Sequence, residues 1–152
     1  MGANQSLEIT LLTGPKRAGK TTWLHKNKSA SAGFLSPIVS EKRQFLLLPS
    51  SETFPMEEPA GQLQVGKYSF SAGAFARVEA HIHQHFHDEE LIIDEIGPLE
   101  IRGEGFSDLL RLILEQYGGK LLIVLRTEIV QEAIEAFQLD RFPLTRIEFK
   151  DL

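Results

Sequence analysis

The sequence predicts an α/β fold in three layers, a mostly parallel sheet with helices on both faces. Short apolar, β-branched runs alternate along the chain with segments of helical periodicity. The most apolar run, KLLIVLR at 120–126, is apolar without alternation, which is typical of a central parallel strand. The chain has 152 residues, 42% of them hydrophobic, and neither an internal repeat nor a linker. We therefore expect a single domain over residues 1–152 with an ordinary core.

The first third of the chain predicts a buried strand, a short helix and two further strands. The run SLEITLLTG predicts the strand over 7–13, ending at a glycine, and a helix should begin near Lys20. This helix is expected to be short, because SASAG at 29–33 is typical of a break. The runs FLSPIVS and QFLLLPS then predict two short strands around EKR. Pro37 would restrict the first of them to a sheet edge or a bulge.

The middle third predicts a loop, a strand, a helix and another strand. Residues 50–61 are acidic and interrupted by prolines, which predicts a mobile loop, and VGKYSF predicts one short strand. A helix should follow with Ser71 as its N-cap. Its apolar stripe consists of Phe75, Val78, Ile82 and Phe86. ELIID at 90–94 then predicts a strand.

The last third predicts two helices and two strands. An i, i+3, i+4 pattern indicates a helix that Gly118 and Gly119 end. Its apolar positions are Phe106, Leu109, Leu110, Ile113, Leu114 and Tyr117. After the strand at 120–126, the spacing of Val130, Ile134 and Phe137 predicts a last helix. TRIEFK at 145–150 predicts an edge strand.

Composition excludes several classes of protein. No apolar stretch approaches the roughly 20 residues that span a bilayer, and the N-terminus lacks the pattern of a secretory signal. The opening Met-Gly-x-x-x-Ser matches only the loose myristoylation pattern. The absence of cysteine excludes disulfides and thiol chemistry, and we expect a cytoplasmic location. The net charge of -5 argues against nucleic acid as a partner.

The segment GPKRAGKT, residues 14–21, fits the phosphate-loop pattern G-x-x-x-x-G-K-[ST] between a predicted strand and a predicted helix. The glycines let the backbone curl so that amides of residues 16–21 and the helix N-terminus face a phosphate. Lys20 would reach the β- and γ-phosphates, Thr21 would bind Mg²⁺, and Thr22 would lie near the α-phosphate. The segment therefore predicts a nucleoside triphosphate as ligand. The predicted binding residues are Gly14, Pro15, Lys16, Arg17, Ala18, Gly19, Lys20, Thr21 and Thr22.

The stretch LIIDEIGPLE supplies a pair of carboxylates at the end of a strand. Asp94 is placed as the second magnesium anchor that a phosphate loop requires, and Glu95 could align and deprotonate an attacking water. The same stretch also fits D-x-x-G, the pattern of a GTP-dependent switch. That interpretation needs an Asn-Lys-x-Asp segment for guanine. The sequence offers only Asn27-Lys28, in the wrong place and without the Asp, so we reject the switch.

The chain resembles the small P-loop nucleoside-triphosphatases known as the cancer-related nucleoside-triphosphatase family. The segments TGPKRAGKTT, GFLSPIVSEKRQF, VGKYSF and DEIGPLE carry the resemblance, the last fitting D-E-I-G-x-x-E through Glu100. It implies a RecA-like sheet and slow, Mg²⁺-dependent hydrolysis of ATP, GTP and other nucleoside triphosphates. In the family pattern G-F-Y-T-x-E-V-R, this chain has Ser36, Ile38 and Ser40 for Thr, Glu and Arg. Contacts made by those three family positions are therefore not transferred.

Several charged residues have two alternative roles. Arg126 follows the strand at 120–126, where it could stabilise charge on the γ-phosphate or simply pair with an acid. Arg43, Arg102 and Arg141 are weaker candidates of the same kind. We expect Glu100 to order the loop after Asp94, through Arg102.

The histidine-rich stretch HIHQHFH could be a metal site or a solvated helix face. At about 100° per residue, His81 and His85 lie on one flank of the apolar stripe and His83 and His87 on the other. One metal ion could take only one such pair, so we favour the solvated face.

The sequence thus predicts a Mg²⁺-dependent nucleoside-triphosphatase, with Lys20, Glu95 and Arg126 as catalytic residues and Thr21 and Asp94 as metal ligands. The first alternative is a kinase that passes the γ-phosphate to a small acceptor. It would need an acceptor pocket and an arginine-bearing lid, and residues 50–61 contain no arginine. The second alternative is a nucleotide-dependent protein-binding module.

Overall fold

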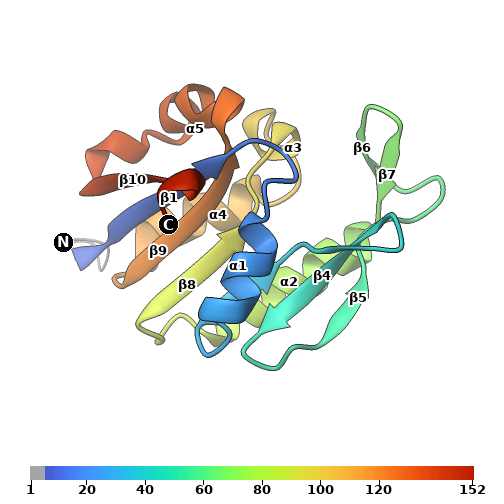
Figure 1. Ribbon diagram of the computed structural model, residues 1–152, viewed down its shortest axis with the longest axis horizontal. Helices are drawn as coiled ribbons and strands as arrows, with labels where there is room; N and C mark the ends of the chain where they lie inside the picture. Colours follow the sequence, from blue (N-terminus) through green and yellow to red (C-terminus); the bar gives the residue numbers. More distant parts are fainter. Residues whose placement is uncertain (1–5) are drawn as a thin grey trace.

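The computed structural model describes residues 6–152 and contains one large sheet and one small hairpin (Figure 1). Gly2 of the Met-Gly-x-x-x-Ser pattern lies outside the described residues. The large sheet has the order β10-β1-β9-β8-β2-β4-β3, with β5 beside β4. Its strands are β1 (Glu8–Gly14), β2 (Ala32–Leu35), β3 (Ile38–Val39), β4 (Lys42–Leu48), β5 (Thr53–Pro55), β8 (Glu90–Asp94), β9 (Lys120–Arg126) and β10 (Leu144–Glu148).

The half of the sheet that carries the phosphate loop is parallel. β10, β1, β9, β8 and β2 run in one direction, and β4 then pairs antiparallel with β2. β9 lies between β1 and β8 and is buried from Leu121 to Leu125, as predicted for a central strand. Consequently the ends of β1 at Gly14 and of β8 at Asp94 lie at the same edge of the sheet.

Helices cover both faces of the sheet, which confirms the three-layer α/β prediction. They are α1 (Lys20–Asn27), α2 (Ala72–Gln84), α3 (Pro98–Ile101), α4 (Ser107–Gln116) and α5 (Val130–Phe137). Figure 1 shows α1 on one face and α2 and α4 on the other. Alternate residues of each strand point to opposite faces. In β1, Leu12 accordingly packs in the core under α1, whereas Leu11 packs in the larger core with α2, α4 and α5.

The region after α1 differs from the prediction. The predicted break after α1 is present as a turn at residues 29–31, but it is shorter than expected, because β2 starts at Ala32 and continues through Gly33, which has φ 137°. A Cβ at Gly33 would collide with the backbone of Ile92 on β8, so this glycine permits a close approach of two strands. Pro37 divides the predicted strand 34–40. Its first part, β2, is internal to the sheet rather than an edge, and only β3 lies at the edge.

The segment between β4 and α2 is more ordered than the sequence suggested. Residues 50–61 include β5, which pairs with β4 through Phe54 opposite Phe45, so the prediction of a plain loop was wrong. VGKYSF at 65–70 contains the predicted short strand as β7 (Tyr68–Phe70), which pairs as a hairpin with β6 (Leu63–Val65). Gly66, with φ 56°, makes the turn that the prediction missed.

The helices agree more closely with the sequence. The hydroxyl of Ser71 accepts a hydrogen bond from the amide of Ala74 at 3.1 Å, which confirms the predicted N-cap of α2. α1 is short, and α4, α5 and the edge strand β10 lie close to the predicted segments. α3 was not predicted, since four residues show no periodicity. Within residues 6–152, no helix combines the length and apolar character needed to cross a membrane.

Candidate functional site

The loop between β1 and α1 has the backbone features that its glycines suggested. Gly19 has φ 104° and Arg17 has φ 61°, and the amide of Trp23 donates to the carbonyl of Gly19 in the first turn of α1. The amides at the start of a helix have no intrahelical acceptor and carry its positive partial charge. Phe149 packs against this loop, so that a Cβ at Gly14 would lie 3.2 Å from the Cβ of Phe149. The loop therefore exposes free amides, and contact with Phe149 stabilises its conformation.

Lys20, the first residue of α1, turns its ammonium group into the loop. Its Nζ donates to the carbonyl oxygen of Gly14 at 3.0 Å and to that of Pro15 at 2.7 Å. The side chain is buried, which lowers the pKa of Lys20, and the nearby carboxylates of Glu95 and Asp94 oppose that decrease. A desolvated cation beside a helix N-terminus provides a strong local positive potential for an anion.

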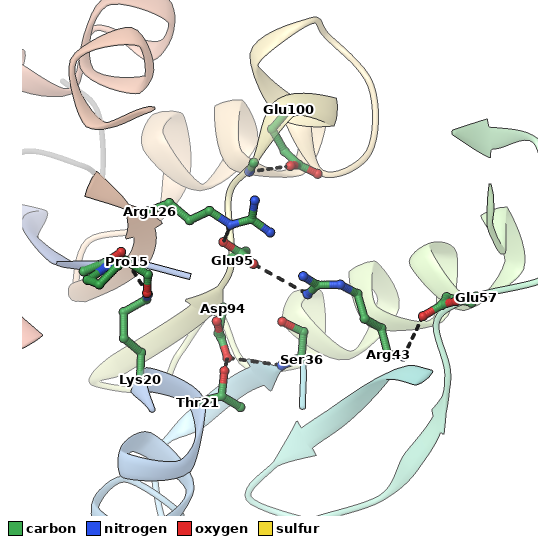
Figure 2. A network of polar contacts seen from close by, with 12 residues as sticks. Pro15, Lys20, Thr21, Ser36, Arg43, Glu57, Asp94, Glu95, Glu100 and Arg126 are labelled. Carbon is green, nitrogen blue, oxygen red and sulfur yellow. Dashed lines mark hydrogen bonds and ion pairs between the residues drawn. The ribbon is translucent and has the colours of Figure 1, made fainter. Parts of the chain in front are cut away.

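Thr21 and Asp94 meet across the end of the sheet, although 73 positions separate them in the sequence (Figure 2). The Thr21 hydroxyl donates to Oδ2 of Asp94 at 2.6 Å, and the backbone amide of Ser36 donates to the same oxygen at 3.2 Å. Asp94 is 2% exposed. Burial raises the pKa of Asp94 to about 6, the neighbouring Glu95 carboxylate adds to the increase, and the two hydrogen bonds oppose it.

Glu95 lies between two arginines. Its Oε1 is 3.6 Å from Nη1 of Arg43 on β4, and its Oε2 is 3.6 Å from Nε of Arg126 at the end of β9. Figure 2 shows the guanidinium groups approaching the carboxylate from opposite sides. All three side chains are partly exposed. The peptide bond between Asp94 and Glu95 is cis. Arg126 thus pairs with an acid, one of its two predicted alternatives, and does so beside the phosphate loop.

These residues surround a cavity of about 260 Å³. Its lining consists of residues 16–22 of the loop and α1, together with Ser36, Pro37, Ile38, Arg43, Asp94, Glu95 and Arg126. The cavity therefore brings together the phosphate loop, the predicted metal ligands and the predicted catalytic residues. Gly14 and Pro15 are not part of the lining but contact Lys20 through their carbonyl groups.

Glu100 orders the backbone next to the cavity. Its Oε1 accepts from the amide of Gly97 at 2.8 Å and its Oε2 from the amide of Phe106 at 2.9 Å. Burial raises the pKa of Glu100 to about 7, and the two amides oppose that increase. The expectation that Glu100 acts through Arg102 was wrong, because Arg102 pairs with Glu104 at 2.9 Å. The carboxylate instead holds both ends of the turn that contains α3.

The other candidates lie elsewhere. Arg141 donates to the carbonyl of Gln138, and neither Arg141 nor Arg102 lines the cavity. His81 contacts the carbonyl oxygen of Leu48 at 2.8 Å, and His85 lies 3.3 Å from Asp88. In the described part of the chain, no three His, Cys, Asp or Glu side chains are grouped as ligands for a metal ion.

Little in the sequence indicated that two residues, Ser36 and Arg43, contribute to the site. Ser36 contributes its backbone amide, which leaves no trace in the choice of side chain. Arg43 was only a weak candidate, because nothing in EKRQF indicates that its side chain reaches Glu95. The pairing of β3 with β4 places Arg43 opposite Ile38, one of the positions where the chain departs from the family pattern.

Comparisons with known proteins place this arrangement in context. A family model described as NTPase matches residues 9–148. The crystal structure of THEP1 from the hyperthermophile Aquifex aeolicus is similar, with a TM-score of 0.71 and 21% identity, covering 92% of this chain and 88% of that one. The solution structure of a human cancer-related nucleoside triphosphatase gives a TM-score of 0.69 and 20% identity, covering 93% and 88%. A search of curated proteins finds no match. At these identities the two structures establish the similarity of the fold alone.

Proposed function

This chain belongs to the NTPase family, and from that membership we propose that it hydrolyses nucleoside triphosphates to the diphosphate and phosphate with Mg²⁺ as cofactor. We further propose that residues 1–152 act as one domain. A cytoplasmic location, the absence of a nucleic-acid partner and a substrate range that includes ATP and GTP stay predictions from the sequence.

The meeting of Thr21 with Asp94 is the observation that carries the proposal. A hydroxyl and a carboxylate lie 2.6 Å apart beside the loop, on different elements that the fold brings together. Magnesium prefers hard oxygen ligands and is commonly bound by one or two carboxylates together with substrate phosphates. This donor set therefore fits Mg²⁺, which would neutralise negative charge that develops on the phosphates. We propose Thr21 and Asp94 as its protein ligands.

Glu95 is our proposed residue for aligning the attacking water. Its carboxylate borders the same cavity as Lys20 and is held on both sides by Arg43 and Arg126, so its orientation is restricted. An oriented carboxylate can accept a hydrogen bond from water and take its proton as the bond to phosphorus forms.

Charge stabilisation is assigned to the loop, Lys20 and Arg126. We propose that the amides of residues 16–21 bind the β-phosphate, that Lys20 contacts the β- and γ-phosphates, and that Thr22 lies near the α-phosphate. Arg126 lies 3.6 Å from Glu95. It could therefore follow the γ-phosphate charge as it moves to the leaving group, in the manner of an arginine supplied in cis.

The test is phosphate release from a panel of triphosphates with and without Mg²⁺. We expect Glu95→Gln to retain binding of a fluorescent nucleotide analogue and to lose turnover, because the amide cannot accept the proton. Glu115→Gln, on an exposed position of α4, is the matched control and should equal the wild type. Undiminished hydrolysis by Glu95→Gln would remove Glu95 from the role proposed for it. Equal hydrolysis with and without Mg²⁺ would contradict the proposal that Mg²⁺ is the cofactor.

A further inference from the structure

A second cavity lies beside the first and has a different character. It has a volume of about 300 Å³ and is enclosed by side chains from β2, β4, β7, α2 and the start of α4. Its aromatic walls are Phe34, Phe45, Tyr68, Phe70, Phe75 and Phe106. Val65, Gly66 and Lys67 at the tip of the β6–β7 hairpin also line it. Apolar walls with few polar groups, at this volume, are typical of a small-molecule site.

The two cavities share one wall. Lys16, Ser36, Arg43, Glu95 and Arg126 line both of them. Lys20, Thr21 and Thr22 line only the first cavity. The second cavity therefore opens toward the pair of arginines around Glu95 and not toward the start of α1.

This placement excludes the base of the bound nucleotide as the occupant. The proposed function places the α-phosphate near Thr22 and the γ-phosphate near Glu95. The base is attached at the α-phosphate end, whereas the aromatic cavity adjoins Glu95. An occupant of the aromatic cavity is therefore a second molecule that meets the far end of the triphosphate.

The side chains that line the aromatic cavity indicate the chemical class of this second molecule. The ring centroids of Phe75 and Phe106 are 4.5 Å apart and those of Phe34 and Phe106 are 4.8 Å apart, so the inner surface consists of packed ring faces and edges. Such a surface favours a flat aromatic ring. Glu100, which is 4% exposed, and Glu95 supply acceptors, and Arg43 supplies a donor. A ring that bears a hydroxyl group would satisfy both parts of the cavity.

We propose that this aromatic cavity binds a small aromatic alcohol, whose hydroxyl reaches Glu95 and accepts the γ-phosphoryl group in place of water. The proposal rests on the assignment of Glu95 in the proposed function. The hydroxyl oxygen forms a bond to the γ-phosphorus, and the bond from that phosphorus to the β–γ bridging oxygen breaks. The nucleoside diphosphate leaves with the electron pair of that bond. The hydroxyl proton passes to the Glu95 carboxylate and then to solvent.

The experiment follows label from [γ-³²P]ATP with Mg²⁺ and the full chain, without a probe and with benzyl alcohol, adenosine or uridine. Cyclohexylmethanol, which has the hydroxyl but no flat ring, is the matched control probe. We expect a labelled phosphate ester with at least one aromatic probe, formed at the expense of labelled orthophosphate, and none with cyclohexylmethanol. Orthophosphate as the sole product with every aromatic probe would overturn the proposal. So would an ester formed equally well with cyclohexylmethanol.

A pair of variants assigns the reaction to the cavity. Val65→Trp places a large side chain in the lining of the aromatic cavity. We expect it to lower the ratio of labelled ester to orthophosphate about tenfold, equivalent to roughly 1.4 kcal/mol. Gln64→Trp, on the exposed neighbouring position outside the lining, should keep the wild-type ratio. An unchanged ratio in Val65→Trp would overturn the assignment. The ¹⁹F signal of 4-fluorobenzyl alcohol should broaden equally with the wild type and with Gln64→Trp, and less with Val65→Trp.

The lane without a probe separates this proposal from the proposed function. Labelled orthophosphate there, with no ester in any other lane, leaves hydrolysis standing and overturns the transfer. If the samples with aromatic probes contain labelled ester while the probe-free sample contains no labelled orthophosphate, hydrolysis is overturned and the transfer is supported.

Discussion

The two adjoining cavities have similar volumes, about 260 and 300 Å³, yet they are built from opposite materials. The first is formed by a loop, a helix N-terminus and ionised side chains, including Lys20 and Asp94 buried with their charges. The second is formed by aromatic rings that belong to the main hydrophobic core. Buried charges cost folding free energy unless they are well paired, whereas buried rings supply it.

The difference between the two cavities shows which part of the fold serves turnover and which part serves stability. The polar cavity lies where the parallel strands end, at the edge where ligands are bound in open α/β sheets. The aromatic cavity lies over the antiparallel part, where β4 and the β6–β7 hairpin leave space between the sheet, α2 and α3. Substitutions in the first cavity should therefore reduce turnover more than stability, and those in the second should reduce stability first.

The largest effect is expected from Phe106→Ala. Phe106 is 2% exposed and contacts the rings of Phe34, Phe45 and Phe75, so its removal leaves a hole that the packed core cannot fill. We expect the free energy of unfolding to fall by about 3–5 kcal/mol, measured by urea denaturation. Phe142→Ala, at a half-buried position, is the control and should lose much less. Equal losses in the two variants would contradict the view that the cavity wall is core.

Lys20→Ala tests the opposite side of the comparison. Loss of one preorganised donor to a developing oxyanion typically reduces kcat by about 10²–10³, and we expect a loss of that order in phosphate release. Lys26→Ala, an exposed position of the same helix, should retain the wild-type rate. If Lys20→Ala lost less of its rate than Lys26→Ala, the view that the polar cavity is specialised for turnover would be contradicted.

Glu100 makes stability depend on pH. Its folded-state pKa is raised from 4.5 to about 7, so the folded state holds a proton that the unfolded state has released between these values. The stability that this proton provides is present below about pH 4.5 and is lost as the pH rises toward 7, by at most about 3 kcal/mol. Urea midpoints measured from pH 5 to pH 8 should fall more steeply for wild type than for Glu100→Gln. Parallel curves would show that Glu100 does not titrate in this range.

The smallest effect is a gain. Asp94→Asn removes a buried charge next to Glu95 and keeps an oxygen that can accept from Thr21 and Ser36. We expect the metal-free protein to become more stable by about 1–2 kcal/mol while phosphate release falls sharply. Thermal unfolding in the presence of a chelator measures the first effect. A less stable Asp94→Asn protein would indicate that the carboxylate stabilises the fold as well as serving the site.

The sequence predicted the polar cavity better than the aromatic one, for a reason of distance along the chain. Seven consecutive residues, 16–22, form half of the first lining, and their motif is local. The second lining runs from Lys16 to Arg126 and depends on the β6–β7 hairpin, on Met56 and on α3, none of which lies in a segment with a long periodic pattern. The helices and central strands were predictable because periodicity reports which face is buried. Gly33 was misjudged because a close strand contact and a helix break use the same residue.

Phe149, which packs against Gly14 and Gly19, has a consequence for the order in which the protein is made. The phosphate loop precedes most strands of the sheet in the sequence, whereas Phe149, whose ring supports it, follows all of them. A nascent chain can therefore carry the complete motif long before the loop has its final shape. We therefore expect a chain in synthesis to bind nucleotide tightly only after β10 has paired with β1.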